Sequence, residues 1–283
     1  MIAFFGMGLL GSNFVRALRR RGEDVQVWNR THERAAALGA EGARAFRDPA
    51  EAARGAARVH LTLTDDAAVD AVLEQARPGL SPSTVIVDHS TTSTQGALAR
   101  IARWRERGIT FVHAPVFMGP QNARESTGLM MISGSREVVA ALRPALAPMT
   151  GKLVDLGERP DAATAFKLLG NAFLICMNGA MADMLALAKA LRVPAAEAAS
   201  LFEQFNPGAT IPGRIKRMVE ASFAEPSWEL KMARKDARLM QEAAAAAGVQ
   251  LMALPGIAAR MDAEIAEGHG EDDWTVIARP AVT

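Results

Sequence analysis

Short apolar runs alternate with longer segments of helical period from Met1 to about Leu156. This alternation is typical of repeated β-α-β units around a parallel sheet. Two amphipathic segments, Leu9 to Arg21 and Thr94 to Arg107, are each followed by a glycine, Gly22 or Gly108, where a left-handed C-cap would lie. The first half is therefore predicted to be α/β. Its expected strands are Ile2 to Phe5, Val25 to Trp28, Val59 to Leu63, Thr84 to Asp88, Thr110 to His113 and Leu129 to Ser133.

After Gly157 the pattern changes, because β-branched runs nearly vanish and Ala, Leu and Met recur at helical spacing. A domain junction is expected at Glu158 to Pro160, giving one domain over residues 1–160 and an all-α domain over residues 161–283. The expected helices are Ala162 to Leu191, Pro194 to Phe205, Pro212 to Ala221, Ser227 to Ala247 and Pro255 to Glu267.

Composition excludes several classes of function. The 32 Lys and Arg nearly balance the 31 Asp and Glu, so the protein has no strong positive electrostatic field that would attract nucleic acid. The chain has no Tyr, which excludes a phenol as proton donor, and its single Cys176 excludes a disulfide framework. The five His show no metal-ligand spacing, and the longest uncharged apolar stretch, Leu168 to Ala182, is short for a membrane span. We expect a cytoplasmic protein with no metal, membrane or nucleic-acid partner.

A glycine-rich motif follows the first expected strand directly and opens the first long helix. Gly6, Met7, Gly8, Leu9, Leu10 and Gly11 form G-x-G-x-x-G. The glycines would allow a tight turn and close approach of the backbone to a pyrophosphate, while the helix N-terminus offers free N–H groups. In this context of strand, turn and helix, the motif predicts dinucleotide binding by these six residues.

The end of the second strand indicates which dinucleotide is bound. NAD enzymes normally place an acidic residue there, whereas this chain carries Asn29, Arg30 and Thr31. A guanidinium can pair with a 2′-phosphate that a carboxylate would repel, so NADP(H) is predicted. The alternative is that Arg30 is an ordinary solvated cation. We also assign Leu63, Thr64, Ser90 and Thr91 to the cofactor, because ligands bind at the carboxyl ends of strands in α/β sheets.

Several motifs in the correct order resemble the β-hydroxyacid dehydrogenases, the family of 3-hydroxyisobutyrate dehydrogenase and the glyoxylate and succinic semialdehyde reductases. The resemblance spans nearly the whole chain and implies a Rossmann domain followed by a helical domain, an active site in a cleft, and a homodimer or homotetramer. It also implies that Lys167 and Asn171 are catalytic and that Lys235 binds the cofactor. The motifs are the glycine turn, Asp88 to Ser93, Ala114 to Val116 with Gly119, Lys167 to Asn171, Lys235 with Asp236, and Gly270 to Trp274.

The substrate loop departs from the family pattern. The family's A-P-V-S-G-G holds the substrate carboxylate with a Ser hydroxyl and glycine amides, but here Phe117 and Met118 replace Ser and the first Gly before Gly119. We assign these three residues to the substrate. They leave its identity open, although the Gly119 amide, Gln121 and Asn122 could still bind a carboxylate.

Lys167 and Asn171 are four residues apart in a helical segment, so they project from one face. A positioned ammonium can stabilise the charge that grows on a carbonyl oxygen during reduction and can donate its proton. The alternative is a helix Lys whose stem covers apolar neighbours. The leading interpretation is an NADP(H)-dependent reductase of a small aldehyde or keto acid. An imine reductase and a dinucleotide-binding protein without turnover remain alternatives.

Overall fold

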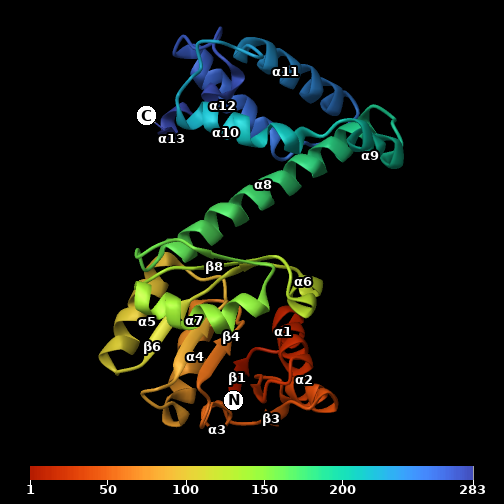
Figure 1. Cartoon of the computed structure of the whole chain (residues 1–283). Helices are drawn as coiled ribbons and strands as arrows, with labels where there is room; N and C mark the ends of the chain where they lie inside the picture. The colour runs from red at the N-terminus through yellow and green to blue at the C-terminus, as the bar shows by residue number, and fades with distance from the viewer. Residues whose placement is uncertain (283) are drawn as a thin grey trace. The chain divides into compact units, whose positions relative to one another are not determined.

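The computed structural model describes residues 1–282, which divide into two compact units, Met1–Asn171 and a second unit from Ala172 onward (Figure 1). The predicted junction at Pro160 precedes helix α8 (Ala162–Ala190), whereas the division between the units lies inside this helix.

The first unit is built on a six-stranded parallel sheet in the order β3-β2-β1-β4-β5-β6. This order confirms the predicted Rossmann-like α/β fold. The strand ends near the glycine turn lie at the centre of the sheet, because β1 pairs with both β2 and β4. The strands are β1 (Ile2–Phe5), β2 (Val25–Trp28), β3 (Arg44–Phe46), β4 (Arg58–Leu61), β5 (Val85–Asp88) and β6 (Thr110–His113).

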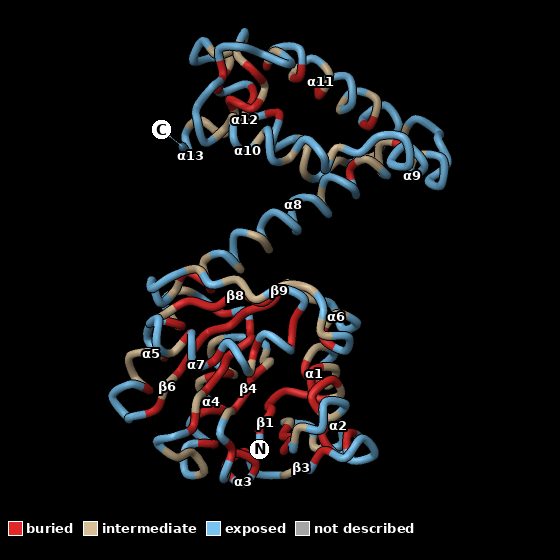
Figure 2. The backbone as a smooth tube through the Cα atoms, in the orientation of Figure 1, coloured by how far each residue is buried: buried red, intermediate tan, exposed pale blue. Residues whose placement is uncertain are grey.

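Both faces of this sheet are covered, as Figure 2 shows by the buried strands in the middle of the unit. Successive residues of β1 point to opposite faces of the sheet and enter different clusters. Phe4 packs in one cluster with Phe14 of α1, and Phe5 packs in the other with Trp104 of α5. Strands buried on both faces read as continuous apolar runs, which is why the sequence reveals them. The helices are α1 (Leu9–Arg20), α2 (His32–Ala36), α3 (Pro49–Ala53), α4 (Asp66–Ala76), α5 (Thr94–Glu106), α6 (Pro120–Glu125) and α7 (Arg136–Leu146).

A second, three-stranded sheet follows, and the sequence did not predict it. Strand β7 (Val116–Phe117) pairs antiparallel with β8 (Leu129–Ile132), and β8 pairs parallel with β9 (Lys152–Asp155). The segment expected to extend the parallel sheet, Leu129 to Ser133, therefore belongs to this smaller sheet. Strands β7 and β9 escaped prediction because β7 has two residues and β9 begins and ends with an exposed charged residue.

The second unit is helical, as predicted. It contains the rest of α8 and five further helices, and its core gathers around residues such as Leu230, Met261 and Val276. The Asp183 carboxylate of α8 accepts three hydrogen bonds of 2.7–2.9 Å from the backbone N–H groups of Met252, Ala253 and Leu254. These bonds attach α8 to the start of α12. The helices are α9 (Ala195–Gln204), α10 (Ile211–Val219), α11 (Leu230–Ala246), α12 (Leu254–Ala266) and α13 (Arg279–Val282).

Helix α8 has an unusually apolar exposed surface. By length and composition alone its 29 residues could cross a membrane, and only 6% of its most apolar window is buried in the structure. It also contains Lys167 and Asp183, and ionisable side chains are costly in a bilayer. Its exposed large apolar residues are Phe166, Leu168, Leu169, Phe173, Leu174, Ile175, Met177, Met181 and Leu185.

Candidate cofactor and carbonyl site

The glycine turn between β1 and α1 has the geometry that its sequence predicts. Gly6 has φ of +94°, and a Cβ on Gly11 would lie 1.9 Å from the Gly6 carbonyl oxygen. Thr62, after β4, donates a hydrogen bond of 2.8 Å from Oγ1 to the same oxygen. The turn therefore requires glycine at both positions, and Thr62 belongs to its support although the motif does not include it.

Gly8 meets open space instead. An added Cβ there would have nothing within 4 Å, and Gly8 lines two cavities of about 310 and 250 Å³. The larger also contains Gly6, Asn29, Arg30 and Thr31, and the smaller also contains Leu9, Leu10, Gly11, Ser90 and Thr91; Leu63 and Thr64 line both. Backbone without side chains beside a helix N-terminus suits a pyrophosphate, so these residues fit a dinucleotide.

Side chains at the end of β2 divide into two groups. Asn29 accepts a 2.9 Å hydrogen bond from the Met7 N–H at Oδ1 and donates one of 2.8 Å to the Thr31 carbonyl oxygen, so its amide supports the glycine turn. Arg30 is exposed and lines the larger cavity together with Arg34. Arg34 lies four residues after Arg30, in α2, and adds a second guanidinium at the predicted phosphate position, although no motif in the sequence marks it.

The loop after β5 approaches the same region. The Ser90 side chain is buried and accepts a 2.8 Å hydrogen bond from the Leu63 N–H, whereas Thr91 is exposed. Asp88 Oδ1 accepts a further 2.9 Å bond from the Ser90 N–H. Burial raises the pKa of Asp88, although the nearby His113 acts to lower it. Ser90 therefore fixes the position of the loop, and Thr91 is the residue whose side chain reaches solvent.

Two buried imidazoles lie beneath this loop. His89 lines the smaller cavity, and its Nδ1 lies 2.6 Å from the Ala114 carbonyl oxygen. Since a carbonyl only accepts, His89 carries its proton on Nδ1, and Nε2 accepts the 2.9 Å bond from His60 Nδ1. Burial lowers the pKa of His89 to about 4 and that of His60 as well. The histidines show no metal-ligand spacing in the sequence, and only the position of His89 directly before Ser90 marks it as part of this region.

Lys167 projects from the first turns of α8 against the substrate loop. Its Nζ donates a 2.8 Å hydrogen bond to the Val116 carbonyl oxygen and lies 4.1 Å from the centre of the Phe117 ring. Burial lowers the pKa of Lys167. The Phe117 ring also packs on Gly170, where a Cβ would lie 2.2 Å from ring atom Cζ. Phe117 therefore covers the ammonium group, and Asn171 follows Lys167 on the same helix, partly exposed.

The polar groups that follow Phe117 in the substrate loop form hydrogen bonds with one another and with nearby residues. The Gly119 N–H donates a 2.9 Å bond to Asn122 Oδ1, and Asn122 Nδ2 donates one of 3.0 Å to Thr127. Gln121 similarly donates to Glu125. Met118 is partly buried against the core. Three groups that could bind a carboxylate thus already have partners in and around α6.

Lys235 lies on α11 in the second unit. It forms a 2.7 Å ion pair with Asp236, and its side chain is about half exposed. Its assignment to the cofactor stays a prediction. In the same unit the side chains of Glu264, Glu267 and His269 are close enough to hold a metal ion. Both glutamates, however, pair with Arg279, and Glu264 also pairs with Arg260, so each carboxylate already has a cationic partner.

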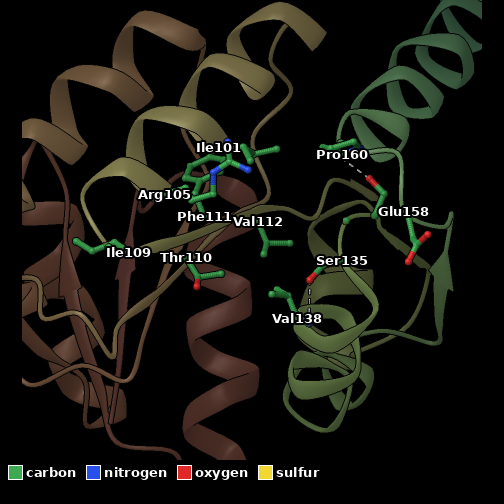
Figure 3. Close-up of a pocket in the computed structure, with 13 residues that line it drawn as sticks. Ile101, Arg105, Ile109, Thr110, Phe111, Val112, Ser135, Val138, Glu158 and Pro160 are labelled. Atoms are coloured by element: carbon green, nitrogen blue, oxygen red, sulfur yellow. Dashed lines mark hydrogen bonds between the residues drawn. The ribbon is translucent and has the colours of Figure 1, made fainter.

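A cavity of about 630 Å³ lies along β6, the edge strand of the large sheet (Figure 3). Its wall is mostly apolar, with Ile101 and Phe111 on one side and Val138 and Pro160 on the other. It shares no lining residue with the two cavities beside the glycine turn, and none of the predicted site residues lines it. Size alone therefore does not mark the functional site in this unit.

Comparison with known proteins identifies the family of the domain that contains the glycine turn. Residues 1–157 match the family model described as the NAD binding domain of 6-phosphogluconate dehydrogenase. The chain is 28% identical to a protein of Mycobacterium tuberculosis named "Probable 3-hydroxyisobutyrate dehydrogenase", covering 98% of this chain and 96% of that protein. It is 27% identical to the 3-sulfolactaldehyde reductase of Escherichia coli, covering 98% of this chain and 94% of the relative.

Among solved structures, the imine reductase of Myxococcus stipitatus in complex with NADP⁺ superposes with a TM-score of 0.92 at 17% identity, covering 99% of each chain. At that identity the likeness shows a shared fold. The fold, the glycine turn and the family model together define an oxidoreductase with an NAD(P)-binding domain. The chain belongs to the β-hydroxyacid dehydrogenase family.

Proposed function

We propose that the protein is an NADP(H)-dependent reductase that converts a small aldehyde or keto compound to the alcohol, with Lys167 as the proton donor. The observation that carries this proposal is the position of Lys167. Its ammonium group is half-buried, bonds to the substrate loop through Val116 and lies in the same unit as the glycine turn. A surface lysine that only covers apolar neighbours would have its ammonium in water.

The ammonium group suits proton transfer to a carbonyl. It has three N–H donors. One is used on the Val116 oxygen and the Phe117 ring lies over the group, which leaves a donor for a substrate oxygen. The lowered pKa of Lys167 brings proton release closer to neutral pH, where general acid catalysis is most effective. When bound, the cofactor supplies the hydride that adds to the carbonyl carbon. Lys167 donates a proton to the oxygen and recovers one from water.

Replacing Lys167 by Met tests this role. NADPH oxidation is followed with a panel of aldehydes, keto acids and cyclic imines, and Lys152→Met on β9 of the same unit is the matched control. We expect kcat to fall by about 10²- to 10⁴-fold in Lys167→Met, with NADPH binding retained, because the side chain acts on the carbonyl. A Lys167→Met enzyme with the turnover of the control would contradict the mechanism.

The same panel separates the alternatives. Imine reduction in preference to carbonyl reduction would favour the activity for which several structural neighbours are named. Tight NADPH binding without turnover on any compound would favour a dinucleotide-binding protein that is not an enzyme. Lys167 beside the substrate loop supports the carbonyl reductase over both.

The preference for NADP(H) rests on Arg30 and Arg34, which line one cavity with the end of β2. Losing a charge-assisted hydrogen bond to the 2′-phosphate costs about 1.5–3 kcal/mol, or one to two decades in affinity. Arg30→Asp should therefore weaken NADPH binding by that factor and leave NADH binding nearly unchanged. Dissociation constants from NAD(P)H fluorescence titration check this. Equal affinity of the wild type for both cofactors would contradict it.

We also propose that a second copy of the chain covers the apolar surface of α8, giving a homodimer or homotetramer in the cytoplasm. The exposed Phe, Leu, Ile and Met side chains of α8 support this, since large exposed apolar surfaces usually mark interfaces. Sedimentation equilibrium of the detergent-free protein tests it. A monomer, or a protein that needs detergent to remain in solution, would overturn the proposal.

A further inference from the structure

His113, the last residue of β6, makes a hydrogen bond with each of its ring nitrogens. Nε2 lies 2.7 Å from the Ser90 carbonyl oxygen, and Nδ1 lies 2.5 Å from Thr164 Oγ1. His113 and Thr164 are both buried. Since the Ser90 carbonyl can only accept, the proton is on Nε2, and Nδ1 of the neutral ring accepts from the Thr164 hydroxyl. Burial lowers the pKa of His113, which favours this neutral form.

These two bonds connect the two parts of the proposed site. Ser90 belongs to the loop beside the glycine turn, and Thr164 lies three residues before Lys167 in the first turn of α8. Residues three apart on a helix share a face, so a change at Thr164 is transmitted to Lys167 through less than one turn of rigid backbone. All of these residues are in the first unit.

We propose that His113 is a positioning residue that sets the distance between the cofactor loop and Lys167. One ring nitrogen fixes the Ser90 carbonyl, and the other fixes the start of α8 through Thr164. The inference rests on the proposed reductase function and adds to it a residue that touches neither substrate nor cofactor. Reacting groups must be aligned to within a fraction of an ångström, which gives such a connection its importance.

Thr164→Val removes the hydroxyl donor and keeps the shape of the side chain. Thr164→Ser restores the donor, and His113→Phe removes both bonds. The matched control is Thr84→Val, because Thr84 is a buried threonine of the same unit that donates one 3.0 Å bond to the Ala56 carbonyl oxygen before β5 begins. Thr164→Val and Thr84→Val therefore each remove one buried threonine hydroxyl that donates a hydrogen bond. Thr84→Val also removes the acceptor of the Ser81 N–H, so the control loses at least as many hydrogen bonds as the test variant.

Two measurements are made on each variant. The first is kcat and KM for NADPH with the best carbonyl substrate. The second is the rate at which acetic anhydride acetylates Lys167, relative to exposed Lys152, determined by peptide mass spectrometry. We expect Thr164→Val to lower kcat by about 10- to 100-fold with an unchanged KM for NADPH, and to raise the relative acetylation of Lys167. Thr164→Ser should restore both values.

The proposal is overturned if Thr164→Val matches Thr84→Val in kcat and in Lys167 acetylation, even if His113→Phe fails to fold. If the wild type reduces no carbonyl compound, the proposed reductase function fails separately. The acetylation rates still decide whether His113 and Thr164 position Lys167, because that measurement needs no turnover.

Discussion

Gly170 and Phe117 offer the sharpest test of the structure around Lys167. A Cβ at Gly170 would lie 2.2 Å from Phe117 Cζ and 2.9 Å from Cε1. Ordinary carbon contacts are about 3.5–4.0 Å, so in Gly170→Ala the ring must swing away from α8. The ring would then lose its cation–π contact with Lys167, which is worth about 0.5–2 kcal/mol.

The effect on stability has two opposing parts. Alanine is better than glycine inside a helix by about 1 kcal/mol, but overpacking costs about 1–3 kcal/mol. We therefore expect Gly170→Ala to be neutral or destabilising in the wild type. In the Phe117→Ser background the ring is gone, so the same change should stabilise by about 1 kcal/mol. The change of sign is the signature of direct contact.

Urea unfolding followed by circular dichroism measures the four free energies of this double-mutant cycle. A coupling of about 1–3 kcal/mol is expected for residues in contact, well above the error of non-interacting pairs. If Gly170→Ala stabilised both backgrounds equally, the Phe117 ring would not lie on α8. The interpretation that Phe117 covers Lys167 would then be refuted.

Three further results are expected. Gly11→Ala should abolish NADPH binding in a fluorescence titration, because the added Cβ would collide with the backbone of the glycine turn. Gly8→Ala is the control for the fold, because its added Cβ would have no atom within 4 Å. Phe117→Ser should raise kcat/KM for glyoxylate relative to an uncharged aldehyde, because a hydroxyl donor replaces apolar surface worth about 1–2.5 kcal/mol; an unchanged ratio would exclude Phe117 from specificity. The pKa of His89 is about 4 in the folded protein and 6.5 in the unfolded chain, so its contribution to stability is complete above pH 6.5. Between pH 6.5 and pH 4 the free energy of unfolding should fall by up to ~1.4 kcal/mol per pH unit. Urea unfolding between pH 7 and pH 4.5 checks this, and a flat profile would contradict it.

The features that the sequence predicted well depend on local patterns. The glycine turn is set by a strand, a helix and glycines within eleven residues, and α8 is set by a long apolar segment without proline. Both were placed almost to the residue. Strand β3 was missed because Arg44–Phe46 is short and begins with an exposed arginine. Such a strand exists only because β2 lies beside it.

The features that the sequence could not predict depend on contacts between distant residues. The bond from Lys167 to the Val116 carbonyl joins residues 51 apart, and the pair of His60 and His89 joins residues 29 apart. The sequence marks Lys167 as a candidate proton donor but does not reveal its bond to Val116, and neither His60 nor His89 reveals its partner. Whether Phe117 lines the substrate cleft or points into the core could not be predicted for the same reason, because its ring packs on Gly170 and Lys167, which are distant from it in the chain.

The bond between His89 and the Ala114 carbonyl oxygen supplies a natural spectroscopic label inside the molecule. Its imidazole proton is buried and held on a single nitrogen, so it should exchange slowly with solvent and give a separate, strongly downfield proton resonance. The acceptor of this proton is the carbonyl of Ala114, the first residue of the segment that leads to Val116 and Phe117. Movement of that segment when a ligand binds would change the length of this bond, and the resonance would record it without any chemical modification of the protein.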